Sequence, residues 1–198
     1  MTKTEQMREI RDEILDLKES PLYEYRTANH FFPVIGEGSH DARIMFVGEA
    51  PGRNEAKTGR PFCGAAGKVL DQLLAHAGID RKSVYVTNIV KDRPPENRDP
   101  TQEEIRIYGP FLDKQIEILQ PKVIAALGRY AMNYIMEKFN LGLEMEPISK
   151  AHGKAYRVTV SYGDIDIVVL YHPCMAVYNP NNMDSLKKDF EALMRYKK

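Results

Sequence analysis

Short runs of apolar residues alternate along this chain with longer segments in which apolar residues recur every three or four positions. The clearest runs are residues 43–48, 84–90, 122–128 and 166–171. Runs of this length are typical of strands that are buried on both faces, whereas the longer spacing is typical of amphipathic helices. The alternation predicts an α/β fold with a mostly parallel sheet that is covered by helices on both faces.

Helices are predicted for five segments, which are residues 3–19, 65–77, 101–120, 129–139 and 183–197. Two of their ends carry local signals. Thr101 and Glu104 form a capping box at a helix start, and Gly78 is a typical helix stop. Residues 155–161 are predicted to pair with the strand 166–171 as a hairpin. The segments between these elements are predicted to be loops.

Length, charge and cysteine content limit the class of protein. The 198 residues suit one domain, with an N-terminal helix at 1–20 and a core at 21–198. The 28 basic and 28 acidic residues balance, which argues against a protein that binds nucleic acid by overall charge. Two cysteines exclude a disulfide-rich scaffold and cannot supply the four thiolates of an iron–sulfur cluster. A charged N-terminus and short apolar runs indicate no signal peptide and no membrane span, so we expect a cytoplasmic monomer.

Three predicted loops follow strands of the sheet, and they are residues 48–64, 88–100 and 172–182. Ligands of open parallel sheets bind beyond the carboxyl ends of the strands, so these loops form the candidate site. In the first loop, Glu49 lies between two glycines, Glu55 adds a second carboxylate and Phe62 offers a flat apolar face. A ligand could approach such a thin backbone closely, although a turn with solvated acids explains the same residues.

The second loop begins at Asn88, whose primary amide can both donate to and accept from the edge of a base. The alternative is a turn residue whose hydrogen bonds are already satisfied. Three basic residues follow, Lys91, Arg93 and Arg98. They are candidates for contacts with phosphate groups, or for a solvated surface.

The third loop begins at His172, whose imidazole can donate a hydrogen bond to developing negative charge, or be purely structural. Val177 and Tyr178 follow in the same loop. Such side chains can act as a wedge between bases, unless the loop folds back onto the core. No metal site is indicated, because none of the five histidines has the spacing of a motif such as HExxH.

Five groups of residues from these loops occur in one order along the chain. They are Gly48-Glu49-Ala50-Pro51-Gly52, Thr58-Gly59-Arg60-Pro61-Phe62, Val86-Thr87-Asn88, Arg93-Pro94-Pro95-Glu96-Asn97-Arg98, and His172-Pro173 with Asn179-Pro180. Over about residues 20–195, the chain in this way resembles the uracil-DNA glycosylase superfamily, and most closely its family 4, the thermostable type. The resemblance implies a three-layer α/β/α sandwich around a four-stranded, mainly parallel sheet. It also implies hydrolysis of the bond between a deaminated base and deoxyribose, after the base has flipped out of the duplex.

The resemblance implies that residues of the first two loops recognise the base. Phe62 would stack on the flipped base, and Asn88 would read O4 and N3 of uracil. Cytosine would not match this pattern, because its N4 is a donor and its N3 an acceptor. Glu55 would lie near C5 and help to exclude the methyl group of thymine. The backbone amides around Ala50 and Gly52 would complete the pocket.

The resemblance also implies the residues that carry the chemistry and hold the DNA. His172 would donate to O2 of the leaving uracil anion, and Glu49 would orient the attacking water and stabilise positive charge on the sugar. No organic cofactor is needed, because these effects are electrostatic and positional. The residues expected to contact DNA are Lys91, Arg93, Arg98 and Lys154 at phosphates, and the loop 174–178 with Val177 and Tyr178 as the wedge.

One departure from the family concerns its iron–sulfur cluster. Family 4 carries a four-iron, four-sulfide cluster on four cysteines, whose aligned positions here are Leu17, Ser20, Asp92 and Tyr108. We therefore expect neither a cluster nor another metal. Ordinary packing should replace the cluster, with Leu17 and Tyr108 among the residues that fill its place.

The expected activity is excision of uracil in base-excision repair, with DNA that contains deaminated bases as the partner. Two alternatives stay open. Gly52 leaves the pocket without the bulky tyrosine of the best-known uracil-specific family, which would suit hypoxanthine or xanthine. Loss of the cluster cysteines could instead accompany a change to a binding module without efficient cleavage. The two cysteines present, Cys63 and Cys174, are expected to be small buried thiols near the pocket.

Overall fold

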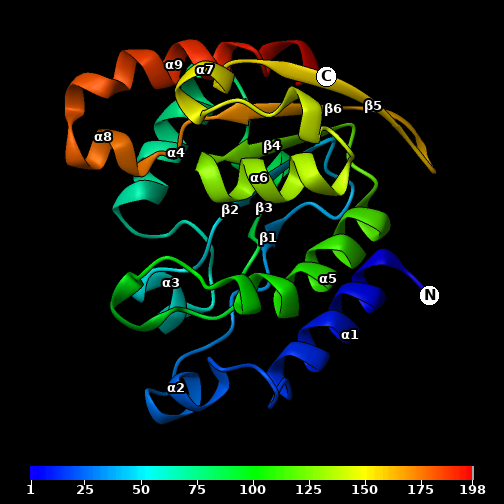
Figure 1. Cartoon of the computed structure of the whole chain (residues 1–198), viewed down its shortest axis with the longest axis vertical. Helices are drawn as coiled ribbons and strands as arrows, with labels where there is room; N and C mark the ends of the chain where they lie inside the picture. Colours follow the sequence, from blue (N-terminus) through cyan, green and yellow to red (C-terminus); the bar gives the residue numbers. More distant parts are fainter. Residues whose placement is uncertain (198) are drawn as a thin grey trace.

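The computed structural model describes residues 1–197 and is built around a six-stranded sheet (Figure 1). In spatial order the strands are β1 (Glu37–Gly38), β3 (Tyr85–Asn88), β2 (Ile44–Gly48), β4 (Val123–Leu127), β6 (Gly163–Leu170) and β5 (Ala155–Val160). The four central strands are parallel, whereas β1 and β5 pair antiparallel with their neighbours. The predicted parallel centre is confirmed. The expected four strands become six, because two-residue β1 is too short to detect and the predicted hairpin strand β5 extends the same sheet.

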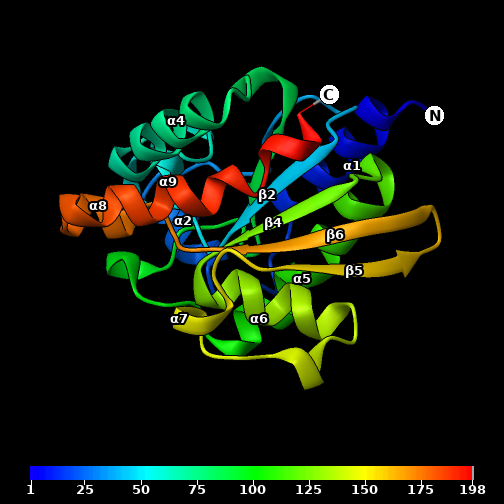
Figure 2. The same cartoon turned by 90° about the horizontal axis from the view of Figure 1, so that it is seen from above.

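Helices cover both faces of this sheet, so the α/β class and the three layers are confirmed (Figure 2). One face carries α4 (Ala65–Ala77) and α9 (Met183–Glu191), and the other carries α1 (Lys3–Leu15), α5 (Gln102–Leu119) and α6 (Gly128–Lys138). Neighbouring strand residues serve opposite layers: Phe46 packs with α4 and α9, and Val47 packs with α1, α5 and α6. Since successive strand side chains point to opposite faces, a continuous apolar run is what two covered faces require.

Several short elements lie in segments that the sequence predicted to be loops. The short helices are α2 (Tyr23–Ala28), α3 (Arg53–Thr58), α7 (Ile148–Ala151) and α8 (Cys174–Tyr178). Single 3₁₀ turns in such segments occur at Arg81–Ser83, Pro95–Asn97, Gly142–Glu144 and Pro180–Asn182. A further one, Met194–Tyr196, follows α9 within residues 183–197, which the sequence predicted to be one continuous helix. Elements of six residues or fewer span less than two helical turns, so apolar spacing cannot reveal them.

The parallel centre brings the loops after the strands to one edge. Gly48 at the end of β2 lies in register with Asn88 at the end of β3, and Leu170 ends β6 at the same edge. The three loops that the sequence singled out therefore meet there, which places the candidate site. Every helix within residues 1–197 is too short or too polar to span a bilayer.

Candidate active site

A pocket of about 360 Å³ opens at the carboxyl edge of the sheet. Its wall brings together nine residues that the sequence singled out, namely Glu49, Ala50, Gly52, Glu55, Phe62, Asn88, Arg98, His172 and Tyr178. They come from three loops that are distant in the chain, and the sheet topology unites them. The volume suits a small planar ligand, since ligand pockets in proteins start at about 300 Å³.

Gly48 allows two side chains to converge in this pocket. A Cβ atom at position 48 would lie 2.3 Å from Oδ1 of Asn88 and 2.8 Å from Cζ of Phe62. Both distances are far below van der Waals contact, so only glycine fits. The side-chain amide of Asn88 has no protein partner among residues 1–197, which leaves its donor and acceptor for a ligand. Gly48 belongs to the first of the five motifs, Gly48-Glu49-Ala50-Pro51-Gly52, but it was not among the predicted site residues.

Phe62 is held in an unfavourable backbone conformation. Its φ is +48°, a left-handed value that bulky residues rarely adopt outside functional sites. Arg81 donates to the carbonyls of Pro61 at 2.9 Å and Phe62 at 3.2 Å, and Gly67 allows the next helix to approach the carbonyl of Phe62. The ring centroid of Phe62 lies 5.5 Å from that of His172. The surrounding structure therefore fixes a flat ring beside the imidazole.

Glu55 has backbone partners that the sequence did not reveal. Its Oε1 accepts from the amides of Cys63 at 3.0 Å and Gly64 at 2.9 Å, which ties α3 to the start of α4. A Cβ at Gly52 would lie 2.7 Å from Oε2 of Glu55. Gly52 thus leaves room for a carboxylate that lines the pocket.

His172 presents one nitrogen to the pocket as a donor. Its Nδ1 accepts a hydrogen bond from the amide of Cys174 at 3.1 Å, so the proton of the neutral ring is on Nε2. Burial lowers the pKa of His172 to about 4, although the nearby Glu55 carboxylate opposes this shift. The ring is therefore neutral near pH 7 and can donate a hydrogen bond to an anionic ligand atom.

We expect NMR to find His172 neutral, with its proton on Nε2, throughout the range from about pH 5 to 8. The physical reason is the burial that lowers its pKa to about 4. Imidazole-¹⁵N spectra should give a protonated Nε2 and an unprotonated Nδ1, with His172→Gln identifying the signals. A titration near the ordinary value of about 6.5 would contradict this assignment.

Glu49 follows β2 and lies in the same wall. Burial raises the pKa of Glu49 to about 7, with a further contribution from Asp99, while Arg129 opposes the shift. Asp99 is itself held by Tyr130, whose hydroxyl donates to it at 2.7 Å, and lies 3.8 Å from Arg129. A carboxyl group that titrates near neutrality is suited to act as a general base.

Lys91 is where the structure contradicts a predicted DNA contact. The side chain is fully buried. Its Nζ donates to Oγ1 of Thr87 at 2.8 Å, the carbonyl of Asn88 at 2.7 Å and Oε1 of Gln115 at 2.6 Å. Three acceptors satisfy its three donors, so Lys91 anchors the end of β3 and cannot reach a phosphate.

The other predicted DNA contacts lie at the surface with protein partners. Arg98 borders the pocket and forms a two-point pair with Glu104, at 2.6 and 2.9 Å. Arg93 is half-buried, whereas Lys154 is exposed and pairs with Glu146.

Two apolar side chains of the third loop are exposed. Tyr178, which borders the pocket, is 86% exposed, and Val177 is 43% exposed. Cys174, in the same loop, is partly buried and lines the pocket, as expected, and burial raises the pKa of its thiol. Cys63 is partly buried and its thiol contacts Thr58.

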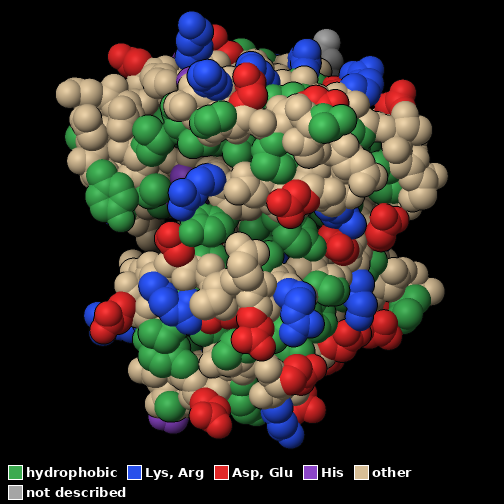
Figure 3. All heavy atoms as spheres, viewed as in Figure 1, with side chains coloured by type: hydrophobic (Ala, Val, Ile, Leu, Met, Phe, Trp, Pro, Cys, Tyr) green, Lys and Arg blue, Asp and Glu red, His purple; other side chains and the backbone are tan. Residues whose placement is uncertain are grey.

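Charges on the surface are mixed. Figure 3 shows acidic and basic side chains interspersed over the visible face, whose outline narrows between the part with α8 and the part with α3. This distribution fits the zero net charge. Contacts with a charged polymer would therefore depend on a few local residues.

The positions that align with the cluster cysteines lie close together but contain no thiol. Leu17 and Tyr108 are buried, as expected. Ordinary packing is an incomplete description, because Tyr108 hydrogen-bonds both Ser20 and Asp92. Iron–sulfur clusters are held by thiolates, and an isobutyl group, a hydroxyl, a carboxylate and a phenol do not fit one. Within residues 1–197, no group of three or more His, Cys, Asp or Glu side chains could hold a metal ion.

Comparisons with known proteins identify the family of this chain. The family model described as the uracil DNA glycosylase superfamily matches residues 35–195. A Type-4 uracil-DNA glycosylase of Sulfurisphaera tokodaii is 44% identical over 188 residues, which cover 94% of this chain and 83% of that protein. One from Archaeoglobus fulgidus is 40% identical over 189 residues, covering 96% and 92%. A Type-5 uracil-DNA glycosylase of Thermus thermophilus is 34% identical over 155 residues, covering 71% and 68%.

Proposed function

The chain belongs to the uracil DNA glycosylase superfamily, and we propose that it hydrolyses the N-glycosidic bond of uracil in DNA, as the first step of base-excision repair. The observation that carries this proposal is the convergence of Asn88 and Phe62 over Gly48, beside a neutral His172. An unpartnered amide, a flat ring and one N–H donor match the edge, the face and the O2 atom of a flipped uracil.

In this proposal, recognition precedes chemistry. Phe62 stacks on the flipped base while the amide of Asn88 donates to O4 and accepts from N3–H. Glu55 and the backbone around Ala50 and Gly52 close the pocket around the ring. Cytosine leaves the Asn88 donor opposite another donor, and an unpaired buried polar group is costly.

Hydrolysis then depends on two groups. The C1′–N1 bond breaks and its electron pair moves onto the base, where Nε2–H of His172 stabilises the charge on O2. Glu49, as a carboxylate, stabilises the positive sugar and accepts a proton from the water that attacks C1′. The products are an abasic site and the uracil anion. The anion takes up a proton as it leaves, and Glu49 returns its proton to solvent.

DNA is held around this pocket by few residues. Arg98, Arg93 and Lys154 contact phosphates, and Val177 with Tyr178 fills the gap left by the base. Stacking of Tyr178 on an exposed base would contribute about 1–3 kcal/mol. We propose that the chain acts as a single-domain monomer in the cytoplasm, on DNA that contains deaminated bases.

The test is an assay for abasic sites. Single- and double-stranded DNA that contains uracil, hypoxanthine or xanthine is incubated with the protein and then cleaved with alkali. We expect cleavage at uracil, and a loss of about 10²–10⁴-fold in kcat/KM for Asn88→Ala and His172→Ala. His76→Ala, at a histidine paired with Glu191 outside the pocket wall, is the control. If none of the three bases yields an abasic site, the proposal of a glycosylase is refuted. A preference for hypoxanthine or xanthine over uracil would support the alternative specificity.

We also propose that the protein works without an iron–sulfur cluster. Ser20, Asp92 and Tyr108 occupy cluster positions and satisfy one another with hydrogen bonds. Protein purified without oxygen should therefore contain less than about 0.1 iron atom per chain by elemental analysis, against the four that a cluster needs. Stoichiometric iron with visible charge-transfer absorption would contradict the proposal.

A further inference from the structure

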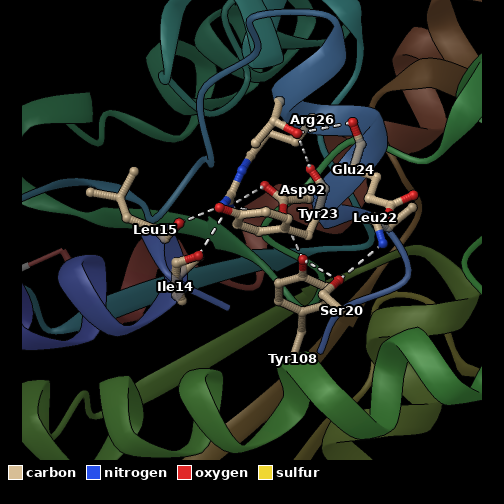
Figure 4. A network of polar contacts seen from close by, with 10 residues as sticks. Ile14, Leu15, Ser20, Leu22, Tyr23, Glu24, Arg26, Asp92 and Tyr108 are labelled. Carbon is tan, nitrogen blue, oxygen red and sulfur yellow. Dashed lines mark hydrogen bonds and ion pairs between the residues drawn. The ribbon is translucent and has the colours of Figure 1, made fainter. Parts of the chain in front are cut away.

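A buried ion pair joins the N-terminal helices to the segment after β3 (Figure 4). Arg26 of α2 donates to Oδ2 of Asp92 at 3.0 Å, and their side chains are 5% and 1% exposed. The same guanidinium donates to the carbonyls of Ile14 at 3.0 Å and Leu15 at 2.6 Å. These carbonyls end α1, where a helix has unsatisfied acceptors and favours a positive charge. One side chain therefore fixes α1, α2 and Asp92 together.

Helix α5 completes the network. Tyr108 of α5 donates to Oδ2 of Asp92 at 2.6 Å, and its oxygen lies 2.7 Å from Oγ of Ser20. Since the phenol proton goes to Asp92, the hydroxyl of Ser20 is the donor to Tyr108. Ser20 in turn accepts from the amide of Leu22 at 3.1 Å. Buried charges need such a complete set of partners, because each unpaired one is strongly destabilising.

The contacts continue from this network to the pocket. Tyr25, which precedes Arg26 in α2, accepts a hydrogen bond from Arg93 at 2.9 Å. The guanidinium of Arg93 also lies over the ring of Phe31 and donates to Oδ1 of Asn97 at 2.7 Å. Asn97 lines the pocket wall. Tyr25 and Arg26 of α2 thus hold Arg93 and Asp92, which lie at the start of the loop that borders the pocket.

The loop itself needs external support. Glu96 and Asn97 have φ values of +56° and +55°, so two successive residues adopt the left-handed conformation that side chains disfavour. Such conformations persist where the surroundings impose them. Two contacts can impose the left-handed conformation here. They are the hydrogen bond from Arg93 to Asn97 and the ion pair of Asp92 with Arg26.

We infer that Arg26, Asp92, Tyr108 and Tyr25 are positioning residues for DNA binding, and that the first three form a metal-free cross-link where the cluster cysteines of the family align. The network fixes the loop 93–98, which presents Arg93, Asn97 and Arg98 beside the pocket. This inference rests on the proposed function, since the loop is positioned for a DNA ligand. The network connects the same segments that carry the four positions of the cluster cysteines, so it takes over the structural role of the cluster.

A split between kinetic parameters tests this inference. Tyr25→Phe removes only the hydroxyl that holds Arg93, and Asp92→Asn removes the charge that Arg26 faces. Both should raise KM for uracil-containing DNA, by about 3-fold and 10-fold, and leave kcat within about 2-fold, because the groups around the base are untouched. Arg26→Lys keeps the positive charge but loses the several N–H donors of the guanidinium. Its KM and kcat should therefore change as in Asp92→Asn.

The control is Tyr134→Phe. It removes another half-buried tyrosine hydroxyl, one that donates to Asp113 at 2.9 Å and lies outside the pocket wall. This variant should leave KM unchanged. Hydrogen exchange, followed by mass spectrometry, should be faster in residues 93–98 of Tyr25→Phe and Asp92→Asn, but not of the control.

The outcomes separate the inference from the function. Variants that melt earlier but keep the KM and the exchange rates of the parent would overturn the positioning role. Tyr25→Phe decides the matter if Asp92→Asn fails to fold, because Tyr25 lies outside the buried ion pair. If the parent protein releases no base, the proposed function fails, while the exchange of residues 93–98 still decides the inference.

Discussion

Replacing Gly48 by alanine should lower kcat/KM for uracil excision by about 100-fold or more, in a protein that remains folded. The new Cβ would lie 2.3 Å from Oδ1 of Asn88 and 2.8 Å from the ring of Phe62. Neither atom can stay in place, so the amide and the ring both move away from the base. A misplacement of about 1 Å in such groups costs on the order of 10²-fold in rate.

The measurement compares Gly48→Ala with Gly142→Ala. A Cβ at Gly142 meets no atom within 4 Å, so this variant makes the same chemical change in open space. Steady-state assays on uracil-containing DNA should find the control equal to the parent. Thermal melting shows whether either variant is folded at the assay temperature. A fully active Gly48→Ala would mean that Asn88 and Phe62 do not read the base from their present positions.

The arrangement of the sheet could be predicted from local patterns, because burial on both faces makes a strand uniformly apolar. Phe46 and Val47 illustrate the rule, since they pack into opposite layers and are both fully buried. From parallel strands it follows that the loops after them share an edge. The pocket could therefore be located before any side-chain position was known.

The direction of individual side chains could not be predicted in the same way. Lys91 and Arg98 stand in one basic loop, yet Lys91 points into the core and Arg98 borders the pocket. The two side chains point in different directions because they have different partners in α5. Lys91 donates to Gln115, and Arg98 pairs with Glu104. Burial of this kind is decided by tertiary packing, on which local charge patterns carry no information.

The cluster site shows a similar limit. The replaced positions Ser20, Asp92 and Tyr108 could be identified by alignment with the family, but the role of Arg26 could not. Its position carries no cluster ligand, and only the fold brings it to within 3.0 Å of Asp92. Loss of the metal ligands therefore predicts that other side chains fill the site. Only the structure shows that the buried carboxylate of Asp92 is paired with the guanidinium of Arg26.

Glu49→Gln should greatly slow uracil excision and also stabilise the protein at alkaline pH. The activity loss, about 10²–10⁴-fold in kcat, follows from removal of the carboxylate that serves the water and the sugar. The gain in stability has a separate cause. Burial, with help from Asp99, raises the pKa of Glu49 to about 7 from its ordinary value of 4.5. Ionising this carboxyl in the folded protein therefore costs free energy.

The sign of the pH dependence follows from proton counting. Between pH values of about 4.5 and 7, the unfolded chain has released a proton that the folded protein keeps, so stability falls as pH rises. Above pH 7 the loss is complete. Because Glu49 is partly exposed, we expect Glu49→Gln to raise the free energy of unfolding at pH 8 by only about 1–2 kcal/mol, and to have little effect near pH 4.

Glu104→Gln provides a control of opposite sign. Burial alone would raise the pKa of Glu104, but the hydrogen bonds from Arg98 and Thr101 outweigh it and hold the pKa below its ordinary value. The ionised group stabilises the fold, so Glu104→Gln should lower the free energy of unfolding at pH 8. Urea unfolding at pH 4 and 8 measures both variants.

The pH profile of the parent protein tests the same carboxyl group through activity. The acidic limb of kcat/KM reports ionisation in the free enzyme, so activity should rise with pH through about 7 as Glu49 loses its proton. His172 adds no limb in this range, because burial keeps its ring neutral down to about pH 4. A limb near pH 4.5 together with an unchanged stability of Glu49→Gln at pH 8 would show that Glu49 is solvated as an ordinary surface acid. The combination of an inactive variant and a more stable fold is the result expected of a carboxylate that the folded protein buries at a cost in stability.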